Sequence, residues 1–101
     1  MPVNRARGEI ALLINGAPRT LCVTLGALAE LEAALDAPSL AELGARLSAL
    51  TASDLLIVLA ALTGGGGAPM SAAELAAARI APKEAAAAVA EAFRLAMGDG
   101  D

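Results

Sequence analysis

Histidine is absent from this chain of 101 residues, and cysteine occurs once, at Cys22. Without histidine the chain has no catalytic triad that uses an imidazole base and no metal site with imidazole ligands. A single cysteine cannot form an intramolecular disulfide, which is consistent with a reducing compartment such as the cytoplasm. Because Cys22 lies within an apolar run, we expect a small buried side chain there rather than a reactive thiol.

Aromatic residues are nearly missing as well, with one Phe and no Tyr or Trp. Sites that stack bases or sugars are built from aromatic faces, so we expect none here. The formal net charge is -4 and the isoelectric point is near 4.6, which disfavours binding to nucleic acid phosphates. Arg5 and Arg7 form a small basic patch, which we interpret as solvated surface.

Long hydrophobic runs are also lacking. The longest strongly apolar stretch, residues 55–62, is far shorter than the about 20 residues that a membrane-spanning helix needs. The first residues do not form the apolar region of a signal peptide. We therefore expect a soluble cytoplasmic protein that does not bind membranes.

Two features that could indicate chemistry are incomplete. The glycine run 64–67 is followed by Ala68-Pro69-Met70 instead of the Lys-Ser/Thr of a phosphate-binding loop, so we interpret it as a flexible hinge. Glu30 and Glu32 stand two residues apart and point to different sides of a helix, so they do not form a carboxylate pair. We expect no catalytic residue, metal, cofactor or small-molecule substrate, and favour a protein-binding module over an enzyme.

The first third of the sequence predicts a β-hairpin. Residues 9–14 and 19–23 have strand composition, and Asn15-Gly16 is typical of a two-residue turn. That turn would place Pro18 in the hydrogen-bonded ladder, so we favour a four-residue loop over residues 15–18. The longer loop pairs Leu12 with Leu21 and Ile10 with Val23.

Capping residues then predict four to five short helices. Thr24, Ser39, Thr51 and Ser71 each stand at the N-cap position of an amphipathic or apolar segment, and Pro82 suits the first turn of a last helix that ends near Met97. The predicted fold class is α+β, mostly α, with an N-terminal two-stranded antiparallel hairpin. The predicted single domain, 1–101, comprises a hairpin (9–23), a helical core (25–63), a Gly-rich hinge (64–69) and C-terminal helices (71–97), with residues 99–101 as a frayed tail.

The apolar positions predict which helix faces are buried. Leu28, Leu31 and Leu35 form the inward stripe of the first helix, and Glu42 is spaced to pair with Arg46 in the second. The third helix has almost no polar face, so it must be central or must meet a partner. The predicted inward face of the last helix is Ala86, Val89, Ala90, Phe93, Ala96 and Met97. Our hypothesis for partner binding names Leu55, Leu59, Leu62, Val89, Phe93 and Met97.

A family resemblance covers residues 7–32. Arg7-Gly8-Glu9, the hairpin, and the run Thr24-Leu25-Gly26-Ala27-Leu28-Ala29-Glu30-Leu31-Glu32 resemble the gene transfer agent tail family. Its proteins are described as tail tube-associated proteins or as phage tail assembly chaperones. The resemblance implies a non-enzymatic role in tail assembly and implies no catalytic residues.

Such a chaperone would bind the helical tape measure protein and keep it soluble while tail tube subunits polymerise around it. The implied partners are the tape measure protein, tail tube subunits, or a second copy of the chain. Two alternatives stay open: a structural tail or tail tube component associated with the particle, and a small regulatory protein-binding module.

Overall fold

The computed structural model describes residues 8–97. In chain order it contains β1 (Glu9–Ile14), β2 (Ala17–Cys22), α1 (Leu25–Ala34), α2 (Leu40–Leu47), α3 (Ala52–Gly65), α4 (Ala72–Ala77) and α5 (Pro82–Ala96). The predicted class is confirmed: an N-terminal two-stranded antiparallel hairpin precedes five helices. The predictions for Arg5, Arg7 and residues 99–101 lie outside the described residues.

The hairpin turns through two residues. Ile14 pairs with Ala17, and Asn15 and Gly16 between them have φ angles of 56° and 80°. Positive φ at both positions defines a type I′ turn. The predicted four-residue loop and its register are therefore wrong: Leu12 faces Arg19, not Leu21, and Ile10 faces Leu21, not Val23.

Pro18 caused the error in the predicted register. The prediction assumed that a residue without an N–H cannot occupy a position in the ladder. In an antiparallel pair, however, opposing residues alternate between pairs that exchange two hydrogen bonds and pairs that exchange none. Ile14 and Ala17 flank the turn and form the bonded pair, so the next pair, Leu13 with Pro18, is a non-bonded one. The Pro18 nitrogen faces the outer edge of β2, where no ladder bond is lost.

Side chains cap four of the five helices at the predicted residues. Thr24, Ser39, Thr51 and Ser71 each accept a hydrogen bond from the backbone N–H three residues later. At Thr51 and Ser71 the acidic side chain in the first turn accepts from the cap's own N–H, which completes a capping box. Pro82 is the first residue of α5, as expected.

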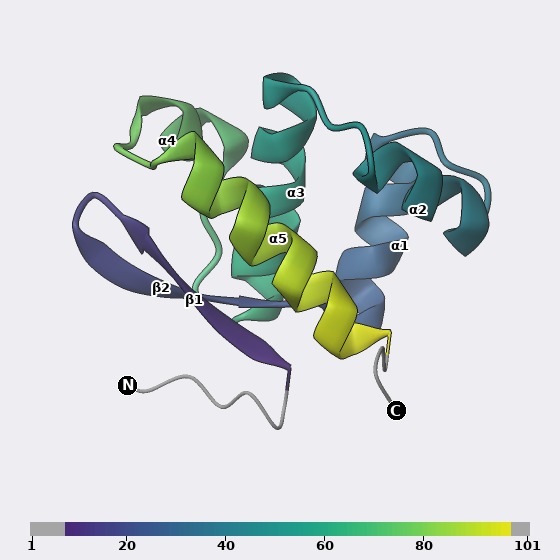
Figure 1. Ribbon diagram of the computed structural model, residues 1–101, viewed down its shortest axis with the longest axis horizontal. Coiled ribbons are helices and arrows are strands. Elements are labelled where there is room, and N and C mark those ends of the chain that lie inside the picture. Colours follow the sequence, from purple (N-terminus) through teal and green to yellow (C-terminus); the bar gives the residue numbers. More distant parts are fainter. Residues whose placement is uncertain (1–7, 98–101) are drawn as a thin grey trace.

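The third helix, α3, lies at the centre of the fold. It contacts β2, α1, α4 and α5, with α5 crossing in front of it and α1 and α2 lying to one side (Figure 1). Val58 and Leu62 are fully buried. The inner face of the hairpin completes this core with Ile10, Leu12, Ile14 and Leu21.

The predicted buried face of α1 is largely correct, whereas that of α5 is not. In α1, Leu31 and Leu35 at its C-cap are buried and Glu30 is exposed, while Leu28 is half-buried. In α5 the predicted face is wrong by about one residue of rotation, because Ala86, Ala90, Ala96 and Met97 are exposed. The buried face is Ala85, Ala88, Val89, Ala92 and Phe93. Seven of the 15 residues of this helix are alanine, so hydrophobicity alone does not distinguish one alanine face from another.

The glycine run has a packing role at the end of α3. The helix continues through Gly64 and Gly65, so the predicted break after residue 63 comes too early. A Cβ at Gly65 would lie 2.1 Å from the carbonyl oxygen of Cys22, and one at Gly66 would lie 2.1 Å from that of Thr20. These glycines let the helix end approach the outer edge of β2 directly. A hinge function for the segment stays a prediction.

The hairpin turn is attached to a distant part of the chain. The Asn15 backbone N–H donates to the Arg79 carbonyl at 3.0 Å, and the Arg79 N–H donates to the Asn15 side-chain oxygen at 2.8 Å. Asn15 therefore has two roles, since it supplies the positive φ of the turn and fixes the turn to the linker between α4 and α5.

Candidate protein-binding surface

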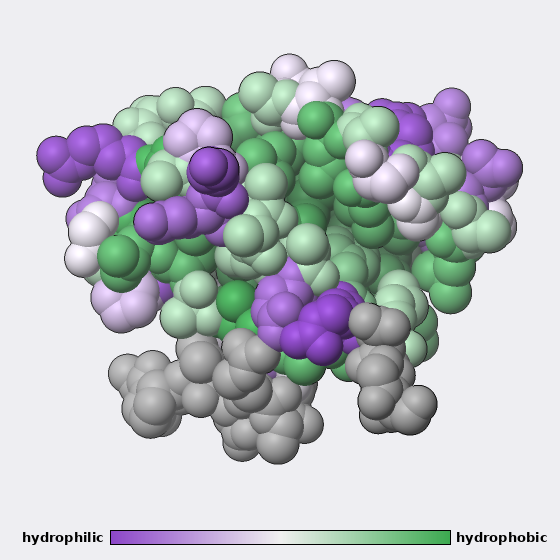
Figure 2. Space-filling model, in the orientation of Figure 1, coloured by the Kyte–Doolittle hydropathy of each residue, from purple (hydrophilic) through white to green (hydrophobic). Residues whose placement is uncertain are grey.

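An apolar groove of about 250 Å³ lies between α3, α4 and the beginning of α5. Its lining side chains are all apolar and include Leu55 and Leu56 of α3, Ala76 of α4 and Ile80 of the following linker. Around it, hydrophobic surface extends over the upper middle of the molecule, between hydrophilic surface on either side (Figure 2). An opening with only apolar walls can bind apolar side chains but offers no group for acid–base or nucleophilic chemistry.

The six residues of the partner-binding hypothesis lie in different environments. Leu59, Leu62, Val89 and Phe93 belong to the core, with at most 8% of each exposed. Leu55 is half-buried on the wall of the groove, and Met97 is 53% exposed at the end of α5. Leu55 and Met97 are therefore the two of the six with appreciable exposed surface, and Leu59 lines the groove although only 1% of it is exposed. Partner binding by these residues stays a prediction.

Sequence reasoning missed most of the groove. Ala76 gave no periodic signal, because α4 is short and its alanines look alike on every face, and Ala78 lies in the linker after it. The capping box at Ser71 predicts where α4 begins, but the side of α4 that faces α3 is set by the buried Leu75.

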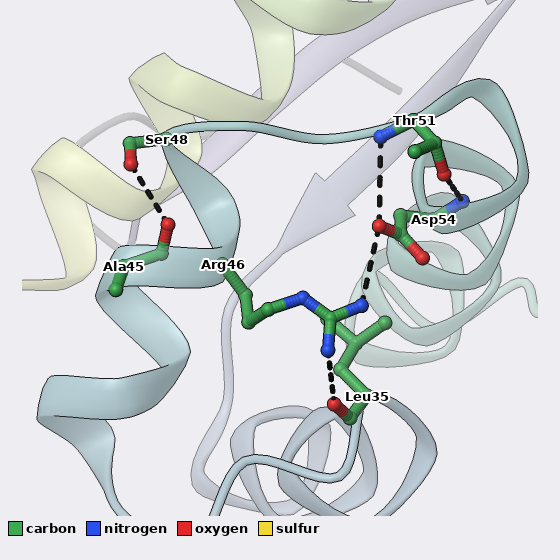
Figure 3. Close-up of polar contacts among 6 residues, drawn as sticks. All are labelled: Leu35, Ala45, Arg46, Ser48, Thr51 and Asp54. Carbon is green, nitrogen blue, oxygen red and sulfur yellow. Dashed lines mark hydrogen bonds and ion pairs between the residues drawn. The ribbon is translucent and has the colours of Figure 1, made fainter.

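A polar cluster fixes α2 against α1 and α3 (Figure 3). The Arg46 guanidinium of α2 donates to the Leu35 carbonyl at 2.6 Å and to Oδ2 of Asp54 at 3.3 Å. Arg46 thus binds Asp54 of α3, whereas the sequence predicted a pair with Glu42. Asp54 also accepts from the Thr51 N–H within the capping box. Partial desolvation raises the pKa of the Asp54 carboxyl, but the Arg46 and Thr51 hydrogen bonds and the charge of Arg46 together hold this pKa below its usual 3.8.

The lowered pKa predicts an acid-sensitive contribution to stability. A carboxyl whose pKa is lower in the folded state stabilises the fold above its unfolded pKa, near 4, and that contribution is lost as the pH falls through the folded value. We expect the wild-type midpoint temperature to fall more steeply from about pH 5 downward than that of Asp54→Asn. Thermal unfolding at several pH values measures this. Glu30→Gln, an exposed position on α1, is the control and should follow the wild-type slope.

Metal and membrane features give no further candidate. Within residues 8–97, no three His, Cys, Asp or Glu side chains are grouped so that they could hold a metal ion. None of the helices in the same segment combines the length and the apolar character that crossing a bilayer requires.

Comparison with known proteins decides the family. The family model described as phage tail tube protein, GTA-gp10, matches residues 7–99, which is nearly the whole chain. The chain belongs to this family. The resemblance of residues 7–32 to the gene transfer agent tail family is thereby confirmed, and the match extends it through the C-terminal helices. The family description names a tail component and no enzymatic activity. No curated protein and no solved structure matches the chain significantly.

Proposed function

We propose that this tail family protein is a tail assembly chaperone that binds an apolar helical segment of the tape measure protein. The observation that carries the proposal is the groove between α3, α4 and α5, whose side chains are all apolar. An amphipathic helix can lay its apolar side into such a groove, and small wall residues such as Ala52 and Ala76 leave room for its larger side chains. The near absence of aromatic residues makes the groove a smooth aliphatic surface, which suits many similar apolar turns of one long helix.

A charge placed on the groove wall tests the proposal. Ala76→Glu puts a carboxylate at an exposed lining position, where a bound apolar helix would strip it of water. We expect this variant to bind the tape measure protein with an affinity that is lower by about tenfold or more, since a loss of 1.4 kcal/mol of binding free energy already gives that factor. The affinity is measured on complexes purified after co-expression of the two proteins.

Ala77→Glu is the matched control. Ala77 is also exposed and lies next to Ala76 in the same helix, but it does not line the groove. Both variants carry the same change in net charge and helix propensity. Equal binding by the two variants would remove the groove from the proposal.

The second candidate is a structural component of the tail, and the family description as a tail tube protein favours it. The two functions differ in what remains in the finished particle. A structural subunit should be found in many copies by mass spectrometry of purified particles, whereas an assembly chaperone should be nearly absent.

A further inference from the structure

The two edges of the hairpin differ. At the outer edge of β2, the carbonyl oxygens of Thr20 and Cys22 face the glycine turn at the end of α3, and Pro18 has no N–H to offer. The outer edge of β1 has no such cover from a described segment. By the alternation of the ladder, the N–H and C=O groups of Ala11 and Leu13 point outward there. No backbone hydrogen bond joins either residue to another described residue on that side.

Strand β1 also lacks the usual protection of an exposed edge. Its six residues contain no proline and no lysine or arginine, and its pairing with β2 runs without a bulge. Leu13 on its outer face is 54% exposed. Such an edge is a ready template for another strand.

A groove beside this edge defines the chemistry of the occupant. It runs between β1 and α5, and its α5 wall consists of the small residues Ala87 and Ala88 with the carboxylates Glu84 and Glu91. The alanines leave space for a backbone and side-chain stems. Both charged side chains of the lining are acidic, and Glu91 is already paired with Arg94. A strand added to β1 would point every second side chain toward these carboxylates and the others outward beside Leu13.

We propose that the β1 edge binds an extended segment of a partner protein whose side chains alternate between basic residues, facing α5, and apolar residues. A second copy of β1 does not fit this description, because its only charged residue is Glu9 and it would bring further carboxylates to the same groove. The site is separate from the groove between α3, α4 and α5, so Ala76→Glu leaves it intact.

A defined peptide tests the proposal on the full chain. The probe is an eight-residue peptide of alternating lysine and valine with blocked ends, and the comparison peptide has glutamate in place of lysine. We expect the lysine peptide to shift the amide resonances of Ala11 and Leu13 and to slow their hydrogen exchange. The glutamate peptide should bind at least tenfold more weakly. Equal binding of both peptides, or no effect at these two amides, would overturn the proposal.

Two variants, each with a matched control, distinguish strand pairing at the β1 edge from general electrostatic attraction. Ala11→Pro removes the outward N–H at a position where the hairpin loses no ladder bond, as Pro18 already does on β2, and should abolish peptide binding. Ala11→Thr keeps the N–H and should bind as wild type. Glu84→Lys should weaken binding severalfold, whereas Glu30→Lys, with the same change in net charge on the exposed side of α1, should not. Unchanged binding in both Ala11→Pro and Glu84→Lys would contradict the proposal even if Ala11→Pro altered the hairpin.

Discussion

Replacing Gly65 with alanine is expected to destabilise the fold by about 3 kcal/mol or more, at the upper end of what overpacking costs. The added methyl carbon would lie 2.1 Å from the Cys22 carbonyl oxygen and 3.2 Å from its carbon. Both are backbone atoms of a paired strand, so no flexible side chain can move aside. Relief requires separating the end of α3 from β2. Chemical denaturation of the purified variant measures the loss, which is large against a total stability of about 5–15 kcal/mol.

Gly64→Ala is the matched control. Gly64 is also in the last turn of α3, but the nearest atom to its added methyl is the Pro69 Cβ at 3.9 Å, an ordinary contact. Since alanine favours a helix by up to about 1 kcal/mol over glycine, this variant should be unchanged or more stable. Equal destabilisation of the two variants would mean that the run acts through chain flexibility and not through its contact with β2.

The second large effect is expected from Leu62→Ala. Leu62 is fully buried in α3, where its side chain belongs to the core shared by the hairpin and the other helices. Truncation of a buried leucine to alanine removes apolar contacts and leaves a cavity, which costs about 2–5 kcal/mol. The control, Leu25→Ala, makes the same chemical change at a leucine that is 82% exposed. We expect a change below about 0.5 kcal/mol there, as for most surface substitutions.

This contrast determines how partner binding can be tested. Leu59 and Phe93 belong to the sequence-based hypothesis for partner binding, but a charge placed at either would be buried in the core and would unfold the protein before any partner is involved. Substitutions at Ala76 and Ala11 avoid the difficulty, because both residues are exposed at the surfaces they are meant to test.

The helix boundaries were predictable because their signals are local. Thr24 and Thr51 accept hydrogen bonds from residues only three positions away, so the pattern in the sequence already contains both partners. The alternation of Ile10, Leu12 and Ile14 with more exposed residues in β1 is a local pattern of the same kind.

Features that depend on distant residues were not predictable in this way. The predicted register of the hairpin was wrong because it excluded proline from every position of the ladder. At every second position the N–H points away from the paired strand, so proline is accepted there. The close approach of Gly65 to Cys22 joins residues far apart in the chain, and four consecutive glycines suggested a hinge. The candidate surfaces were missed for a related reason, since Ala76 and Ala87 become distinctive only through what packs beside them.

The attachment of Asn15 to Arg79 sets an order of events during synthesis. The two residues are separated by 64 positions, so at about 5–20 residues per second the ribosome needs roughly 3 to 13 s to supply Arg79 after Asn15. Throughout that interval neither of the hydrogen bonds that fix the hairpin turn to the α4–α5 linker can form. The strands also leave the ribosome before α3 and α5, the helices that cover them. A two-stranded hairpin alone is marginally stable, so the strands gain a stable environment only after these later helices are synthesised.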